Sequence, residues 1–239
     1  MLSDLKHEVC HANKALQTQG LSPLTWGNVS GFDADKGVMV IKPSGVPYEA
    51  LTPEMLVVVD LDGKIVEGEY KPSSDTPTHL YLYAHFDGLG GVTHTHSTYA
   101  TMFAQSAREL PCLGTSHADH FHGAIPVARC LTPEEVESDY TGNTGRVIVE
   151  CFLNRDALAV PAVFVAHHAP FTWGRSPRES LDNAIALEMV SKMALGTFLL
   201  NPTIDTIPEH IVNKHYTRKH GSAATYGQHD ARTETGELV

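Results

Sequence analysis

Apolar residues recur at helical spacing at the start of the chain, and short apolar runs follow them. Five residues spaced three or four apart predict an amphipathic helix: Leu2, Leu5, Val9, Ala12 and Leu16. Gly20 is expected to end this helix. The next runs are short and rich in β-branched residues, so strands are predicted within 24–32, 38–43 and 56–68. Asp62-Gly63 lies inside the last run and predicts a hairpin turn there.

The rest of the chain alternates between segments whose apolar residues have helical spacing and short apolar runs that are typical of strands. Further strands are expected at 90–96, 147–150 and 161–168. Helices are expected at 76–86, 99–107, 177–199 and 207–220, the last closed by Gly221. Pro77 suits the first turn of a helix, and Ser176 with Glu179 has the spacing of a capping box.

This mixture of helices and hairpin-compatible strands predicts one fold class. We expect a three-layer α/β/α sandwich whose central sheet is mainly antiparallel. Neither a repeat nor a linker interrupts the chain, so residues 1–228 are expected to form a single domain. Residues 229–239 are polar and aperiodic, and we expect them to be a mobile tail.

Composition narrows the classes of function. The 17 Lys and Arg against 28 Asp and Glu give a formal net charge of −11, which argues against nucleic acid or an anionic membrane as the main partner. The N-terminus lacks the apolar core of a signal peptide, and three charges interrupt the apolar stretch 181–200, so a buried helix is expected there. Four scattered cysteines are typical of free thiols in a reducing cytoplasm.

Histidine is the residue type that stands out, with 15 copies. His94 and His96 are two apart on an expected strand, so both imidazoles point to one face and can reach one cation. A second apolar strand ends in His167-His168, whose side chains point to opposite faces, so only one of them is expected to bind. The alternative is that these are strand-end histidines without a ligand role.

Several polar motifs have two interpretations each. Ser73 and Ser74 precede an expected helix, where hydroxyls and free N–H groups suit a phosphate, and Asp75 is either the helix cap or a metal ligand. The other candidates for anion or ligand contact are equally consistent with turns or bulges: Gly27, Asn28, Ser44 and Gly45, with Lys42 nearby as positive charge. The segment 117–122 is dense in His and Asp, but a solvated loop explains it as well.

Taken together, seven motifs resemble one family. TWGNVS, VIKPSGV, KPSSDTPTH, GGVTHTHS, GTSHADHF, HHAPFTWG and NKHYTRKHG…YGQ resemble the L-ribulose-5-phosphate 4-epimerases of the class II aldolase/epimerase superfamily, in the expected order over residues 1–228. Two departures occur: AHHAPF stands where HxHGPF is usual, with His167 added and Ala169 in place of a Gly, and His120 stands where a Tyr commonly follows the aspartate. The related aldolases carry Glu at the position of Asp75, which favours the epimerase.

The resemblance implies a role for each matched position. The implied divalent-metal site consists of Asp75, His94, His96 and His168. The implied substrate and phosphate contacts are Gly27, Asn28, Ser44, Gly45, Ser73, Ser74 and His215, to which the residue-based argument adds Lys42. The implied acid–base pair is Asp119 and Tyr226.

The expected activity is interconversion of L-ribulose 5-phosphate and D-xylulose 5-phosphate at C4, by retro-aldol cleavage of C3–C4, rotation of bound glycolaldehyde phosphate and re-addition. The resemblance implies Zn²⁺, with Mn²⁺ or another divalent ion as alternatives, and a homotetramer with active sites at subunit interfaces. The alternatives are a class II aldolase for fuculose or rhamnulose 1-phosphate, a zinc-buffering module, and an adducin-like interaction domain, which the complete histidine set disfavours. The pathway, arabinose or ascorbate catabolism, is left open.

Overall fold

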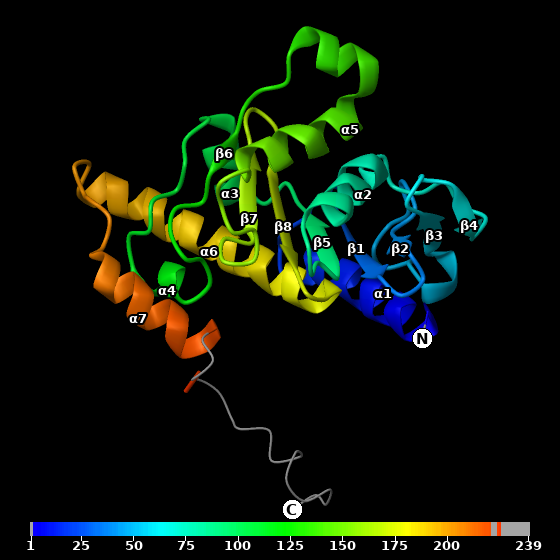
Figure 1. Cartoon of the computed structure of the whole chain (residues 1–239), viewed down its shortest axis with the longest axis horizontal. Coiled ribbons are helices and arrows are strands. Elements are labelled where there is room, and N and C mark those ends of the chain that lie inside the picture. Colours follow the sequence, from blue (N-terminus) through cyan, green and yellow to red (C-terminus); the bar gives the residue numbers. More distant parts are fainter. Residues whose placement is uncertain (1, 221–223, 226–239) are drawn as a thin grey trace, which may run out of the picture.

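The structure, a computed structural model, describes residues 2–220 and 224–225. At its centre is one sheet of eight strands: β1 Asn28–Asp33, β2 Val38–Ile41, β3 Val57–Asp60, β4 Ile65–Glu67, β5 Gly91–His94, β6 Val127–Ala128, β7 Ala162–Val165 and β8 Pro170–Gly174. Their spatial order is β4-β3-β2-β1-β5-β8-β7-β6 (Figure 1). Only β6 and β7 pair in parallel among these strands, so the expected mainly antiparallel sheet is confirmed.

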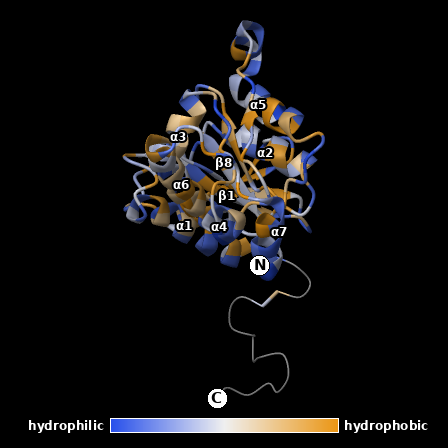
Figure 2. Ribbon diagram, turned by 90° about the vertical axis from the view of Figure 1, so that its left-hand side faces the viewer, coloured by the Kyte–Doolittle hydropathy of each residue, from blue (hydrophilic) through white to orange (hydrophobic). Residues whose placement is uncertain are grey.

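Helices cover both faces of this sheet. They are α1 Leu2–Thr18, α2 Thr76–His85, α3 Thr98–Gln105, α4 Thr115–Ala118, α5 Pro133–Cys151, α6 Pro177–Leu200 and α7 Glu209–His220, with a short 3₁₀ turn at Pro53–Met55. Figure 2 shows the three layers edge-on, with β1 and β8 between α6 and α2.

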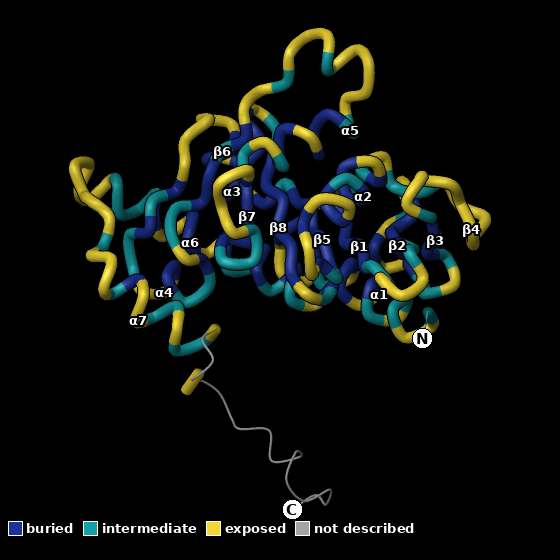
Figure 3. The backbone as a smooth tube through the Cα atoms, viewed as in Figure 1, coloured by how far each residue is buried: buried dark blue, intermediate teal, exposed yellow. Residues whose placement is uncertain are grey.

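Successive side chains along a strand point to opposite faces of the sheet, so each apolar side chain packs against the helices of one face or the other. Val40 and Val58 pack against Val9 of α1, whereas Met39 and Ile41 belong to the core cluster that includes α2. Helices α1 and α6 share the first face, since both approach Gly31 of β1, and α3 packs on α6. Apart from β4, which is exposed at the edge of the sheet, the strands are accordingly deeply buried (Figure 3).

Most expected elements are present near their predicted bounds. The hairpin at Asp62-Gly63 joins β3 to β4, and Gly63 has the positive φ of +79° that its turn requires. The last helix begins at Glu209, and Gly221, its expected terminator, lies outside the described residues, as do 229–239. Helix α6 is the one described helix long and apolar enough to cross a membrane, and its buried side, which includes Leu181 and Leu187, packs on the sheet as expected.

The predicted strand at 147–150 is wrong, because these residues lie in α5. Val147 and Ile148 form part of the buried face of that helix, and a four-residue apolar run does not distinguish a strand from such a face. The start of α5 was missed as well, although Thr132 and Glu135 form a complete capping box there. Strand β8 and the short elements α4 and β6 were also not predicted.

Only one of the two hydrogen bonds of the capping box expected at the start of α6 is formed. Ser176 Oγ accepts the Glu179 amide at 3.1 Å, but the Glu179 carboxylate accepts from the Arg175 amide at 2.7 Å instead of returning to Ser176. The hydroxyl therefore caps the helix while the carboxylate secures the residue before the cap.

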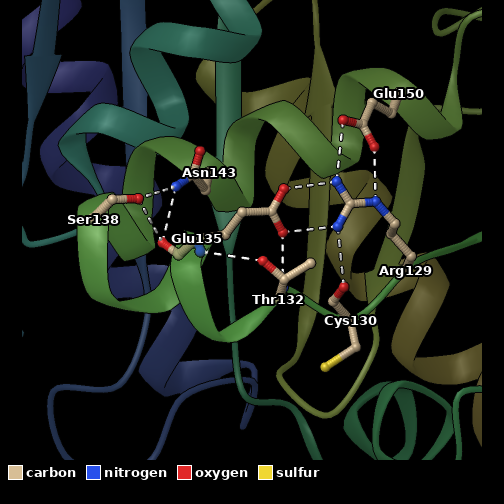
Figure 4. A network of polar contacts seen from close by, with 7 residues as sticks. All are labelled: Arg129, Cys130, Thr132, Glu135, Ser138, Asn143 and Glu150. Carbon is tan, nitrogen blue, oxygen red and sulfur yellow. Dashed lines mark hydrogen bonds and ion pairs between the residues drawn. The ribbon is translucent and has the colours of Figure 1, made fainter.

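Helix α5 is bent, and one guanidinium holds both of its halves. Asp139 has non-helical angles (φ −161°, ψ 84°) inside the helix. Arg129, which follows β6, donates to Glu135 before the bend and to Glu150 after it, at 2.8–3.2 Å (Figure 4). These contacts fix the first half of α5 relative to the sheet.

Two helical glycines provide a matched test of helix packing. A Cβ at Gly145 of α5 would lie 2.6 Å from Cβ of Tyr81 on α2, whereas a Cβ at Gly196 of α6 would meet nothing within 4 Å. We expect Gly145→Ala to lower the free energy of unfolding by about 1–3 kcal/mol through overpacking. Gly196→Ala should raise it by up to about 1 kcal/mol through helix propensity. Urea unfolding followed by circular dichroism measures both, and equal effects would contradict the close α2–α5 packing.

Candidate metal centre and adjoining cavity

Three imidazoles meet at one end of the sheet. His94 is the last residue of β5, His96 follows two residues later, and His168 lies in the turn that joins β7 to β8. One ligand nitrogen from each ring lies within 4.8 Å of the other two. His167 is not part of this cluster and has a positive φ of +62°. The structure therefore brings together the three histidines to which the metal was assigned.

His94 is held by its backbone and aromatic neighbours. Its Nδ1 lies 3.0 Å from the carbonyl oxygen of Pro170, which can only accept a hydrogen bond, so Nδ1 carries a proton and Nε2 is the nitrogen left for a metal ion. The ring stacks on Phe171 with centroids 4.2 Å apart. This arrangement fixes both the tautomer and the orientation that a metal ligand needs.

The other two rings are neutral at physiological pH. Burial is the main cause that lowers the pKa of His96 to about 4 and that of His168 to about 3, and the neighbouring histidines add to it. Nδ1 of His168 is buried and has no hydrogen-bond partner among the described residues. Because cations bind the neutral imidazole, these two neutral rings and the closely spaced ring of His94 fit a divalent metal ion.

The Asp75 carboxylate lies beside this cluster and does not cap its own helix. Asp75 occupies the N-cap position of α2 but makes no side-chain capping bond; instead its Oδ2 accepts from Asn28 Nδ2 at 2.6 Å. Burial raises the pKa of Asp75, but interactions with His94 and His79 and the Asn28 hydrogen bond outweigh it, so the pKa is lowered. The carboxylate is therefore an anion next to the three rings.

A cavity of about 480 Å³ joins the cluster to the predicted anion contacts. Its lining contains every matched metal position and all but one of the predicted substrate positions: Gly27, Asn28, Lys42, Ser44, Gly45, Ser73, Ser74, Asp75, His94, His96 and His168. Backbone hydrogen bonds from Ser44 to Lys71 and from Ser73 to Lys42 hold the two serine loops side by side.

Lys42 is a buried cation at the serine end of the cavity. The residue is 2% exposed, and its Nζ donates to the Pro43 carbonyl at 3.2 Å and lies 5.1 Å from the centre of the Tyr48 ring. Burial lowers its pKa to about 8. No carboxylate in the described part of the chain forms an ion pair with it, so this end of the cavity suits an anion.

The predicted acid–base residue Asp119 is not in this cavity. Asp119, at the end of α4, accepts from Arg218 at 2.7 and 3.0 Å and from His215 at 3.0 Å, both on α7. Burial raises the pKa of Asp119, but these hydrogen bonds prevail and lower it. Neither Asp119 nor His215 lines the cavity of its own chain, and Tyr226 lies outside the described residues.

Some residues of the site were not predicted. Trp26 contacts His96 edge to face at 6.1 Å, and Tyr140, just after the bend of α5, lies 5.9 Å from the His168 ring. Both line the cavity, as do Thr25, Pro43 and Thr141. Trp26 lies within the TWGNVS motif, so the sequence offered a signal for its place in the site. The position of Tyr140 at the cavity depends on the bend of α5, which no local sequence pattern predicts.

Comparisons with known proteins agree with this geometry. The family described as Class II Aldolase and Adducin N-terminal domain matches residues 7–195. L-ribulose-5-phosphate 4-epimerase UlaF of Salmonella paratyphi C is 49% identical over 227 residues, which cover 95% of this chain and 100% of that relative, and UlaF of Salmonella choleraesuis matches equally well.

Solved structures of related proteins share the fold. An L-fuculose 1-phosphate aldolase superposes with a TM-score of 0.75 at 26% identity, covering 89% of this chain and 94% of its own. The L-fuculose-1-phosphate aldolase from Thermus thermophilus gives a TM-score of 0.64 at 25% identity, covering 85% of this chain and 98% of its own.

The two consecutive histidines allow a matched test of the cluster. We expect His94→Ala and His168→Ala each to lose bound divalent metal, because two imidazoles do not maintain a three-ligand site. His167→Asn, which tolerates the positive φ, should keep the wild-type content. Elemental analysis of the purified proteins measures this, and undiminished metal in His168→Ala would contradict the assignment.

Proposed function

The chain belongs to the class II aldolase and adducin N-terminal domain family, and from this premise we propose that it is a metal-dependent L-ribulose-5-phosphate 4-epimerase. One observation carries the proposal: a single cavity joins a three-histidine cluster to a buried lysine and two serine loops. A sugar phosphate needs both parts, a cation site for its oxygens and an anion site for its phosphate. The 49% identity to the UlaF epimerases supports the same substrate.

Epimerase activity is favoured over the aldolase alternative. Identity to the epimerases is 49% over nearly the whole chain, against 26% to the fuculose-phosphate aldolase. Asp75 also stands where the related aldolases carry Glu as base. A metal-free interaction domain is disfavoured, because such a domain needs no set of three converging imidazoles.

The chemistry follows from the position of the carbonyl. C4 of the ketose is not adjacent to the C2 carbonyl, so its proton is not acidic, whereas cleavage of C3–C4 sends the bonding electrons into that carbonyl as an enediolate. His94, His96 and His168 would hold a divalent cation, for which we propose Zn²⁺ with Mn²⁺ as the alternative, and this cation would stabilise the developing negative charge. Asp75 completes the proposed set of ligands.

The loops that carry Ser44 and Ser73 hold the phosphate of glycolaldehyde phosphate while the aldehyde end of this fragment turns. Lys42 supplies the positive charge, and Ser44, Gly45, Ser73 and Ser74 supply hydroxyl and amide donors. Asn28 links this cradle to the metal side, since its Nδ2 donates to both Ser73 and Asp75. With its phosphate held, glycolaldehyde phosphate rotates its aldehyde, and re-addition to the opposite face inverts C4.

Each orientation of the C4 oxygen needs a proton-transfer group, and we propose Asp119 and Tyr226. The separation of Asp119 from the cavity of its own chain supports a homotetramer in which a neighbouring subunit supplies Asp119, Tyr226 and His215. The four cysteines, which form no disulfide, are consistent with a cytoplasmic location.

The decisive experiment is an NMR assay of the purified protein with L-ribulose 5-phosphate, with and without a chelator. We expect D-xylulose 5-phosphate to appear and the chelator to abolish it. Cleavage of fuculose or rhamnulose 1-phosphate without epimerisation would establish the aldolase instead. A metal-loaded protein without any sugar-phosphate turnover would support a metal-buffering role.

Acid–base variants test the second half of the site. Asp119→Asn and Tyr226→Phe should each reduce turnover by about 10²-fold or more, because each removes one proton-transfer group. Bound metal should stay at the wild-type level in both, since neither residue is a proposed ligand. Full activity in either variant would reject that residue's role.

The buried lysine predicts a pH dependence of substrate binding. With a pKa of about 8, Lys42 is positively charged below this pH and loses its charge above it, so KM should rise as the pH passes 8. Lys42→Met should raise KM by about 10–100-fold, the equivalent of one charged hydrogen bond, and remove this pH dependence. The matched control is Lys71→Met at an exposed lysine nearby, and an unchanged KM in Lys42→Met would contradict the cradle.

A further inference from the structure

Behind the metal cluster lies a fourth histidine that the proposed reaction does not use. His79 of α2 is fully buried. Its Nδ1 lies 2.7 Å from Ser30 Oγ, which lies 2.8 Å from the phenol oxygen of Tyr83. Its Nε2 is buried and has no hydrogen-bond partner among the described residues. A buried polar atom left unpaired at the end of an ordered chain of hydrogen bonds calls for a role.

The position of His79 on α2 directs it toward Asp75. The two residues are four apart, so their side chains lie on the same side of the helix, and the His79 amide donates to the Asp75 carbonyl at 3.0 Å. Helical side chains lean toward the N-terminus, where Asp75 stands. Phe171 separates His79 from the cluster, because its ring stacks on His94 and meets His79 edge to face at 6.1 Å.

The Asp75 carboxylate favours one tautomer of His79. Ser30 Oγ can donate to Nδ1 or accept from it, so this contact by itself is compatible with either tautomer. A proton on Nδ1 would turn the unshared pair of Nε2 toward the carboxylate, an unfavourable arrangement away from water. With the proton on Nε2, Tyr83 donates to Ser30, Ser30 donates to Nδ1, and the positive edge of the ring is on the side of Asp75.

We infer that His79 is a positioning residue that acts through Asp75: the buried chain Tyr83–Ser30–His79 keeps an unpaired N–H on the side of that carboxylate, which favours its negative charge and its place beside the three-histidine cluster. Asn28 holds the other side of the same carboxylate through Oδ2. The inference rests on the proposed metal role of the cluster, and it assigns to the side chains behind a ligand the task of orienting it.

A double-mutant cycle with Co²⁺ alone tests this without any substrate. Its members are the wild-type protein, His79→Leu, Asp75→Asn and the double variant, each titrated with Co²⁺ and followed by visible absorption. We expect His79→Leu to weaken Co²⁺ binding by about 10–100-fold when Asp75 is present. In the Asp75→Asn background the same change should weaken Co²⁺ binding by less than about 2-fold, because the carboxylate through which His79 acts is absent. Equal losses in both backgrounds would overturn the inference, since a purely structural role is additive.

A milder variant covers the case in which His79→Leu does not fold. Tyr83→Phe keeps the ring and removes only the oxygen at the far end of the chain, so it should weaken Co²⁺ binding in the wild-type background and leave Asp75→Asn unchanged. His85→Leu, at an exposed histidine of the same helix, should bind Co²⁺ like the wild type. Wild-type Co²⁺ affinity in a folded His79→Leu would refute the inference, whereas a wild-type protein that does not bind Co²⁺ would refute the metal site itself.

Discussion

The antiparallel pairing of β5 with β8 is the contact on which the candidate site depends. It sets His94 opposite Phe171, and the turn from β7 into β8 then places His168 against His94. A register shift of one residue would turn the His94 side chain to the other face of the sheet, away from the other two histidines of the cluster. The register is protected by close packing, because a Cβ at Gly91 would lie 2.3 Å from the Ser176 carbonyl at the start of α6.

The cavity combines two electrostatic environments that favour opposite charges. At one end, burial keeps His96 and His168 neutral and ready to bind a cation, with the Asp75 carboxylate beside them. At the other end, Lys42 is a buried cation in a protein of net charge −11. The Asn28 side chain joins the two ends through hydrogen bonds to Asp75 and Ser73. A ligand with an oxygen-rich head and a phosphate matches this polarity along its length.

Asp119, a proposed acid–base residue, lies at a distance from this cavity. The α4–α7 contact holds Asp119 between His215 and Arg218, with its pKa lowered, and this group does not open into the cavity of its own chain. The bend of α5 has the opposite effect, since it brings Tyr140 and Thr141 to the cavity wall although they are distant in sequence from the histidines. Two surface glutamates and Arg129 keep that bend in place (Figure 4).

The sequence by itself determined the local parts of this protein. Alternation put His94 and His96 on one face of a strand, and hydrophobic periodicity predicted α1, α2, α3 and α6, since these signals depend only on neighbouring residues. Tertiary structure decided the rest. Whether 147–150 is strand or helix, whether Asp75 caps α2 or turns to Asn28, and where His79 sends its N–H all depend on contacts between segments far apart in the chain. Such contacts form only once the sheet is assembled, and burial there changes the free energy of a polar group by more than any local preference.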